Sequence, residues 1–201
     1  MITDPVPLRG NKRKEYERSD ALKSLAVPVN DRFHALDIEA ALSSGSAASI
    51  RATCRTFLAE AAQFYGVPPP KVRVLAARPL KVYETGSIEL FGDYDLKTSV
   101  IRVWTRTAIR HRVTSFGTFF STLCHEFCHH LDLHLFGILT SPHTRGFYER
   151  TAVLYHHCRG TPPRRLVWLP FGRGRFRIDW ARMRLVRGTG GIGSNRYPRL
   201  S

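Results

Sequence analysis

Cysteine is scarce in this sequence, and no two cysteines have the CxxC spacing of a zinc ribbon or a redox pair. The four that occur, Cys54, Cys124, Cys128 and Cys158, do not suggest a disulfide scaffold. We expect them to remain thiols in a reducing compartment and to act as small buried apolar side chains. The cysteine content thus excludes the small disulfide-rich secreted proteins as a class.

Long apolar runs are missing as well. No stretch reaches the length of a transmembrane helix, and residues 1–20 have no apolar core of the kind that a signal peptide needs. These absences predict a cytoplasmic protein that does not interact with a membrane. The 201 residues, 43% of them hydrophobic, are enough for a single globular domain with a core of its own.

Acidic residues are few: 16 Asp and Glu stand against 31 Lys and Arg, which gives a formal net charge of +15. The excess is greatest in residues 160–201, which hold ten arginines and one aspartate. Such a segment favours anionic partners, and we expect any contact with nucleic acid through it to be non-specific and weakened by salt. The alternative is a solvated basic face without a partner.

Hydrophobic periodicity and turn residues divide the chain into three parts. Residues 1–20 are polar and basic without apolar periodicity, which predicts a flexible leader. Residues 21–160 form the main domain, and residues 161–201 form a basic C-terminal hairpin and tail packed on the same domain. We expect helices at 32–44, 47–65, 114–136 and 144–159, and strands at 71–78, 87–94, 99–104, 164–170 and 175–180. The predicted fold class is α+β, with a small, mostly antiparallel sheet.

The segment TLCHEFCHHLDLHLFG sets four histidines and two carboxylates into an apolar, helical pattern. Burying such groups without partners costs free energy, so their density indicates a function. His125 and His129 are four residues apart, so both imidazoles leave the same face of a helix and can converge on one cation. Glu126, the second residue of this HExxH pattern, is placed to reach a metal-bound water rather than the metal. The pattern predicts a zinc site in which Glu126 takes the proton of that water.

Zinc needs a third protein ligand, and several residues are candidates. His130 and His134 point away from the motif face, so helix geometry disfavours them. Two candidates follow the helix: His143, which opens the next helix after residues 138–142, and Glu149, a carboxylate on that second helix. The remaining candidates are Asp132, His156 and His157. Spacing alone does not decide between His143 and Glu149.

The residues HEFCH, followed by HTRGF from His143 to Phe147, resemble the SprT-like zinc metallopeptidases, a family that includes the Spartan proteases. In that family a histidine in an H-x-x-x-F context opens a helix and supplies the third ligand. The segment GDYDLKTSVIRVWTRTA before the motif also resembles the substrate-side hairpin of the family. The likeness covers residues 65–160, and the chain lacks the C-terminal CxxC zinc ribbon that many relatives carry.

The resemblance implies a zincin-like fold and a Zn²⁺ ion held by His125, His129 and His143. Glu126 would be the general base, with the fourth position open for water. The implied reaction is hydrolysis of peptide bonds in a protein or peptide substrate, with DNA-associated proteins as one substrate class. Residues 88–92 are the expected strand edge for pairing with the substrate. The alternative is a nucleic-acid-binding or structural protein with a vestigial or structural zinc site, although such a site has little need of Glu126.

Three further residues near the motif have two interpretations each. Asp132, on the metal-facing side of the helix, could accept a hydrogen bond from a ligand imidazole or be a carboxylate on the helix surface. Tyr148 and Tyr155 could stabilise an oxyanion, but tyrosines on an amphipathic helix usually pack with their hydroxyl groups satisfied. We therefore expect the two tyrosines to be packing residues.

Overall fold

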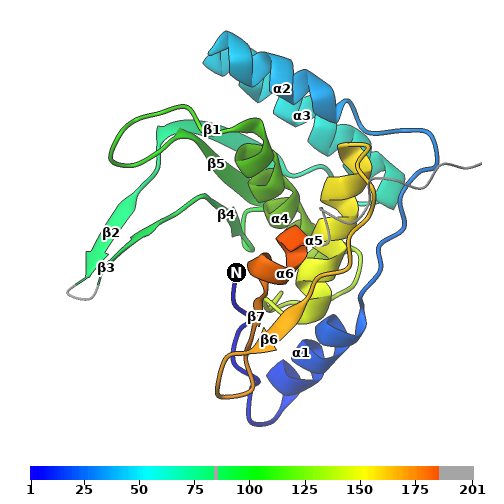
Figure 1. Cartoon of the computed structure of the whole chain (residues 1–201). Helices are drawn as coiled ribbons and strands as arrows, with labels where there is room; N and C mark the ends of the chain where they lie inside the picture. The colour runs from blue at the N-terminus through cyan, green and yellow to red at the C-terminus, as the bar shows by residue number, and fades with distance from the viewer. Residues whose placement is uncertain (84–85, 186–201) are drawn as a thin grey trace, which may run out of the picture.

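The computed structural model describes residues 1–83 and 86–185 (Figure 1). The helices are α1 (Asn11–Ala21), α2 (Ala35–Ser44), α3 (Ala47–Tyr65), α4 (Phe116–His134), α5 (Arg145–Cys158) and α6 (Trp180–Leu185). The strands are β1 (Lys71–Ala77), β2 (Leu80–Tyr83), β3 (Gly86–Glu89), β4 (Gly92–Asp95), β5 (Val100–Arg106), β6 (Trp168–Pro170) and β7 (Phe176–Ile178). Helices and small sheets are mixed along the chain, so the fold class is α+β, as predicted. No helix in this described part combines the length and apolar content that crossing a bilayer requires.

The helices expected from periodicity are present as α2, α3, α4 and α5. Side-chain caps set where three of them begin, and the third is that of α5, where the Thr144 hydroxyl accepts from Phe147 N. The hydroxyl of Ser46 accepts a hydrogen bond from Ser49 N at 3.2 Å, which starts α3. The hydroxyl of Ser115 accepts one from Thr118 N at 3.4 Å. This cap explains why α4 begins one residue after Ser115 rather than at the predicted position 114.

The predicted flexible leader at 1–20 is instead folded. It contains α1, in which Tyr16 and Ser19 are buried. The last turn of α1 packs so closely on the start of α5 that a Cβ atom on Gly146 would collide with the carbonyl oxygen of Ser19. The helix sequence NKRKEYERSDA has no apolar stripe, because its contacts with the rest of the protein are mainly polar. Hydrophobic periodicity therefore gave no sign of it.

The main sheet is mixed rather than mostly antiparallel, which corrects the prediction. Its strand order is β1–β5–β4. β1 pairs with β5 in parallel, from Lys71 beside Val100 to Ala77 beside Arg106, whereas β4 pairs antiparallel with β5. A parallel pair needs a crossover connection, and here the crossover holds the β2–β3 hairpin, which extends away from the sheet, and β4 (Figure 1). The alternation of apolar and polar residues within each strand does not reveal whether two strands pair in parallel or antiparallel.

The strand expected at 87–94 is divided into two. β3 ends at Glu89 and belongs to the β2–β3 hairpin, whereas β4 begins at Gly92 and forms the edge of the main sheet. Arg78 marks the junction: its Nη1 lies 3.0 Å from Glu89 Oε2, and its guanidinium stacks 3.9 Å from the centre of the Phe91 ring. The sheet edge beside α4 is therefore β4, so of the expected edge 88–92 only Gly92 belongs to it.

The core lies between one face of the sheet and the helices α3 and α4. Ile101 and Val103 of β5 are fully buried on this face, and the ring of Phe57 on α3 meets Phe120 on α4 edge-on, with centroids 5.1 Å apart. All four cysteines are buried free thiols, as expected. Burial raises the pKa of Cys54 to about 12, which keeps it protonated.

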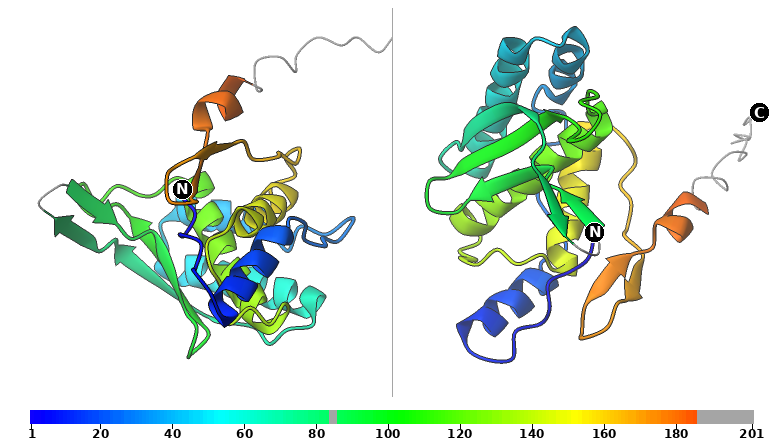
Figure 2. Two further views of the ribbon diagram at one scale, coloured as in Figure 1. Left: turned by 90° about the horizontal axis from the view of Figure 1, so that it is seen from below. Right: turned by 90° about the vertical axis from the view of Figure 1, so that its left-hand side faces the viewer.

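The C-terminal segment forms the expected antiparallel hairpin, β6 with β7, and continues into α6. The chain start joins this hairpin: Ile2 pairs with Arg177, and Thr3 N donates to Phe176 O at 2.8 Å (Figure 2). Ile178 at the end of β7 is buried. The two ends of the described chain thus lie side by side. The tail predicted at 188–201 lies outside the described residues.

A buried ion pair joins α4 to α5 and α1. Arg150 Nη2 donates to Asp132 Oδ1 at 2.7 Å, and the two side chains are 1% and 0% exposed. Nη1 of Arg150 donates to the carbonyl oxygens of Ser19, at 3.0 Å, and of Leu22, so the guanidinium also holds the end of α1. Removing one partner would leave a buried charge without compensation, which costs far more than an exposed ion pair contributes.

We predict that Arg150→Ala lowers the free energy of unfolding by about 3–5 kcal/mol, because the Asp132 carboxylate is left buried and unpaired. Urea denaturation followed by circular dichroism measures the change. The matched control is Arg13→Ala, which removes an exposed pair with Glu17 on α1 and should leave the midpoint unchanged. Equal midpoints for the wild type and Arg150→Ala would contradict the role given to this ion pair.

Candidate metal centre

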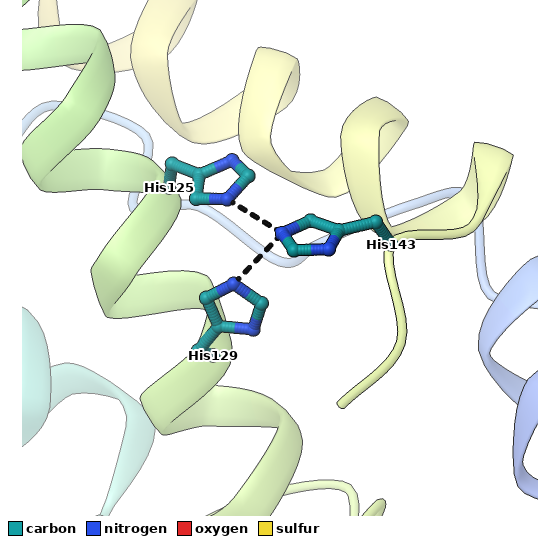
Figure 3. Close-up of side chains that lie close together, drawn as sticks. All are labelled: His125, His129 and His143. Carbon is teal, nitrogen blue, oxygen red and sulfur yellow. Dashed lines mark hydrogen bonds between the residues drawn. The ribbon is translucent and has the colours of Figure 1, made fainter. Parts of the chain in front are cut away.

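Three histidines meet at one point between α4 and the start of α5 (Figure 3). Nε2 of His143 lies 3.0 Å from Nε2 of His125 and 3.2 Å from Nε2 of His129. Their ligand atoms all lie within 4.8 Å of one another, as binding to a single metal ion requires. The structure therefore brings together the three histidines that the sequence named as candidate ligands.

Local structure explains how the three rings converge. His125 and His129 lie one turn apart on α4 and project from the same side. Gly137, just beyond this helix, has a φ of 61°, a conformation that glycine adopts without strain and that lets the chain turn back. His143 follows, two residues before α5 begins. The motif helix and the return of the chain thus place the third ring opposite the first two.

Hydrogen bonds fix the ring of His129. Its Nδ1 lies 2.7 Å from the hydroxyl oxygen of Ser141, and that hydroxyl donates its own proton to Asp132 Oδ2 at 2.9 Å. Because the Ser141 proton is engaged, its oxygen accepts the N–H of His129, which must then be at Nδ1. Nε2 of His129 is left with its lone pair directed at the other two histidines. This is the tautomer in which an imidazole can bind a metal through Nε2.

The N-terminal segment holds His143 in place. Its backbone N donates to Asp4 Oδ2 at 2.8 Å, and Asp4 N donates back to His143 O at 2.9 Å. The same carboxylate oxygen lies 3.5 Å from Nδ1 of the His143 ring. The segment therefore supports the third histidine directly. Two further carboxylates of this segment accept backbone N–H groups on either side of His143: Glu15 from Thr140 and Asp20 from Arg145.

The donor set fits zinc. Burial lowers the pKa of His125 to about 3 and that of His129 well below its usual value, so both rings are neutral and can bind a cation. Nitrogens that share a tetrahedral zinc ion at about 2.0–2.1 Å lie about 3.3 Å apart. The observed separations of 3.0 and 3.2 Å are close to this value.

Glu126 lies in the same cleft without belonging to the histidine cluster. Its side chain is buried, and burial, with a smaller contribution from the charge of Asp93, raises its pKa to about 8. β4 passes over it so closely that a Cβ atom on Gly92 would lie 3.0 Å from Glu126 Oε1 and 2.5 Å from Thr122 Cγ2. Glycine at position 92 therefore allows the edge strand to approach the carboxylate.

The histidines and Glu126 line a cleft of about 940 Å³, together with residues 89–94 and the loop before α5. Tyr148 also lines it, and its ring stacks on His143 with centroids 5.8 Å apart. Its hydroxyl donates to Ile2 O at 3.1 Å, so it is satisfied within the protein, as expected for a packing residue. One wall of the cleft is thus the sheet edge, and the other is formed by α4 and the start of α5.

The rival candidate ligands lie elsewhere. Glu149 accepts a hydrogen bond from Trp168 Nε1 at 3.2 Å, so it anchors the C-terminal segment. His130 is fully buried, and its ring is bonded to the Tyr94 hydroxyl at 2.9 Å and to Pro68 O at 2.7 Å. It therefore joins α4 to the sheet. His134, His156 and His157 also bond outside the cluster, to Ser99, Thr161 and the backbone of Asp31.

Asp132 corresponds to neither of the two interpretations drawn from sequence. It is not on the helix surface, and it reaches His129 through Ser141 rather than directly. Sequence reasoning missed Ser141 and Asp4 altogether. Ser141 lies in an irregular turn that carries no motif, and Asp4 is 139 residues away from His143 along the chain. A rule that each metal-binding imidazole needs a partner for its second nitrogen would have led to a search for such residues.

Comparison of the chain with models of known protein families, with curated proteins and with solved structures finds no match. The class of site is therefore defined by its own geometry. It consists of three convergent histidines and a buried carboxylate, all lining one cleft. The likeness to the SprT-like metallopeptidases rests on the motif residues of the sequence.

We predict that the protein binds one zinc ion per chain and that His143→Ala lowers its zinc affinity by more than about 100-fold, beyond the loss expected from removing a residue that merely supports a ligand. The control is Glu149→Ala, which removes a carboxylate of α5 that lies outside the cluster and should keep the wild-type affinity. Competition with a chromogenic chelator, with elemental analysis, measures both. Full occupancy in His143→Ala with loss in Glu149→Ala would reverse the ligand assignment.

We predict that Asp4→Ala lowers zinc affinity about tenfold, because it removes the acceptor that holds the backbone of His143. Asp4→Asn keeps an acceptor oxygen at that position and should lose less. Glu17→Ala, an exposed carboxylate on α1, is the control for a change of charge in the N-terminal segment. The same chelator competition serves for all three variants. Wild-type affinity in Asp4→Ala would mean that His143 is positioned without the N-terminal segment.

Proposed function

We propose that the protein is a zinc-dependent peptidase with a zincin-like fold and a site similar to that of the SprT-like metallopeptidases. The observation that carries this proposal is the position of Glu126, which lines the cleft beside the three histidines but is not one of the cluster. Among the described residues, that cluster offers three ligand atoms, so a fourth position remains for water. A structural zinc site normally fills all four positions with side chains and has little need of a carboxylate beside them.

In this proposal Glu126 is the general base. Zinc, when bound, supplies a positive charge that lowers the pKa of a water molecule and polarises the scissile carbonyl group. The Glu126 carboxylate accepts the proton of the attacking water and delivers it to the amine that leaves. Burial raises the proton affinity of Glu126, which suits a group that must carry a proton from one step to the next. His129 is kept in its binding tautomer throughout by Ser141.

β4 supplies the edge on which a substrate would lie. One side of β4 pairs with β5, and its residues line the cleft that contains Glu126. An extended peptide laid along this edge would add a strand to the sheet by backbone hydrogen bonds. It would pass next to the carboxylate, because Gly92 brings β4 into contact with Glu126. The need for an extended strand favours unfolded or flexible protein segments as substrates.

The basic C-terminal segment makes nucleic acid the proposed anionic partner, which would bring DNA-associated proteins to the cleft. Arginines already lie against two of its aromatic rings in the described residues: Arg175 stacks over Phe171, and Arg145 lies 4.4 Å from the centre of the Phe176 ring. Contacts with phosphate groups rather than base stacking would therefore dominate, with a strong dependence on salt. Four arginines of this segment are exposed in the described part of the chain: Arg165, Arg173, Arg177 and Arg182.

We predict that Glu126→Gln lowers peptidase activity by about 100-fold or more, because the amide keeps the shape of the side chain but does not accept the proton of water. The metal content should stay that of the wild type, since Glu126 is not a ligand. The assay is cleavage of casein, and of a basic DNA-binding protein with and without DNA. Chelator-treated enzyme restored with zinc shows whether the activity depends on metal.

Undiminished cleavage by Glu126→Gln would assign the activity to a contaminating protease. A zinc-loaded wild type that cleaves none of these substrates would reject the proposed function and favour a non-catalytic zinc protein.

A further inference from the structure

A second cavity, of about 410 Å³, opens beside the metal cleft. The two share four lining residues: Met1, Thr118, Ser121 and Tyr148. Its volume is within the range of about 300–1,000 Å³ that is typical of small-molecule sites. The cavity therefore adjoins the cleft in which the proposed reaction takes place, and it is large enough for one bulky side chain.

The lining of this cavity is mostly apolar. It comes from Met1, from the first turns of α4, from α5 and from the C-terminal segment. Leu166 is tied to α5 because its backbone N donates to Glu149, whose other oxygen holds the Trp168 indole. The walls are thus built before any ligand enters. Six apolar or aromatic residues line this cavity without lining the metal cleft: Ala152, Tyr155, Leu166, Ile178, Trp180 and Met183.

The distance from the cavity to the metal centre is set by α4. Ser121, at the shared wall, lies one helical turn before His125, a rise of about 6 Å along the axis. An extended peptide advances about 3.3–3.6 Å per residue. A peptide with its scissile bond at the histidines therefore places a side chain at the mouth of the cavity within about two residues of that bond.

We propose that this cavity is a specificity pocket that receives a large apolar side chain, such as Phe, Leu or Met, next to the scissile bond of the substrate. The inference rests on the proposed peptidase function. The C-terminal segment lies outside the region of resemblance to the SprT-like metallopeptidases. It contributes five of the lining residues: Arg164, Leu166, Ile178, Trp180 and Met183. In this protein the segment then has a role in substrate choice besides its charge.

The test fills the pocket. Ala152→Phe places a ring in the cavity from α5, and Ala52→Phe makes the same change on the exposed face of α3 as a matched control. First, mass spectrometry maps the cut sites in a random peptide library. Two peptides that differ only in the residue beside the cut site, Phe or Ala, are then compared. We expect the wild type to cut beside large apolar residues. Ala152→Phe should lower kcat/KM for the Phe peptide about tenfold or more. The kcat/KM for the Ala peptide should stay unchanged.

Cleavage of the library without preference for large apolar residues would overturn the pocket assignment. An equal loss of kcat/KM for both peptides in Ala152→Phe would do the same. If Ala152→Phe does not fold, Leu166→Ala tests the same pocket by enlarging it. This variant should raise the rate for a Trp peptide relative to that for the Phe peptide. Unchanged selectivity in that variant would count equally against the proposal.

A binding measurement separates this inference from the proposed function. Fluorescently labelled Phe and Ala peptides are titrated into zinc-loaded Glu126→Gln, with and without Ala152→Phe. The pocket predicts tighter binding of the Phe peptide, lost in the double variant. This result combined with a wild type that cleaves nothing would reject the peptidase and keep the pocket. Equal binding of the two peptides would reject the pocket even if the wild type is an active peptidase.

Discussion

The buried carboxylate of Asp132 is the constraint on which the rest of the structure depends. One of its oxygens accepts a hydrogen bond from Arg150, and the other accepts one from Ser141. The first contact fixes α5 and the end of α1 against α4, and the second orients the ring of His129. A charge at 0% exposure must have both partners, because the interior does not solvate it. Stability and the geometry of the metal centre therefore depend on the same side chain.

The N-terminal segment extends this dependence to the third histidine. His143 lies at the entry of α5, where the first backbone N–H groups of a helix lack partners. Carboxylates from the chain start accept hydrogen bonds there, Asp4 from His143 N and Asp20 from Arg145 N. These contacts join residues more than a hundred positions apart along the chain. The centre is thus assembled by polar groups from both ends of the domain around a helix pair with an apolar core.

The parts of this structure that follow from local rules could be predicted from sequence, and those that depend on distant partners could not. The i, i+4 spacing places His125 and His129 on one face of α4 whatever the rest of the fold is. His143 became the favoured third residue through resemblance, because spacing alone left Glu149 equally possible. The structure brings His143 into the cluster and gives Glu149 to the Trp168 indole.

The predictions that were wrong, those for residues 1–20 and for the main sheet, have a common physical origin. α1 has no apolar stripe, since Glu15 and Asp20 hold it by polar contacts that periodicity does not register. The parallel pairing of β1 with β5 depends on a crossover through the β2–β3 hairpin, which no single strand encodes. In both cases, tertiary partners rather than local sequence determine the outcome.

Burial shifts the pKa values of His125 and of Glu126 in opposite directions. A bound cation would be compatible with both shifts. Burial lowers the pKa of His125 and raises that of Glu126, so without a metal the site favours neutral forms of both. A bound cation needs the neutral histidines and also stabilises a nearby carboxylate in its charged form. In the proposed function the ion would make Glu126 available as a base, while burial keeps its proton affinity high. The close packing of β4 over Glu126, allowed by Gly92, contributes to this burial.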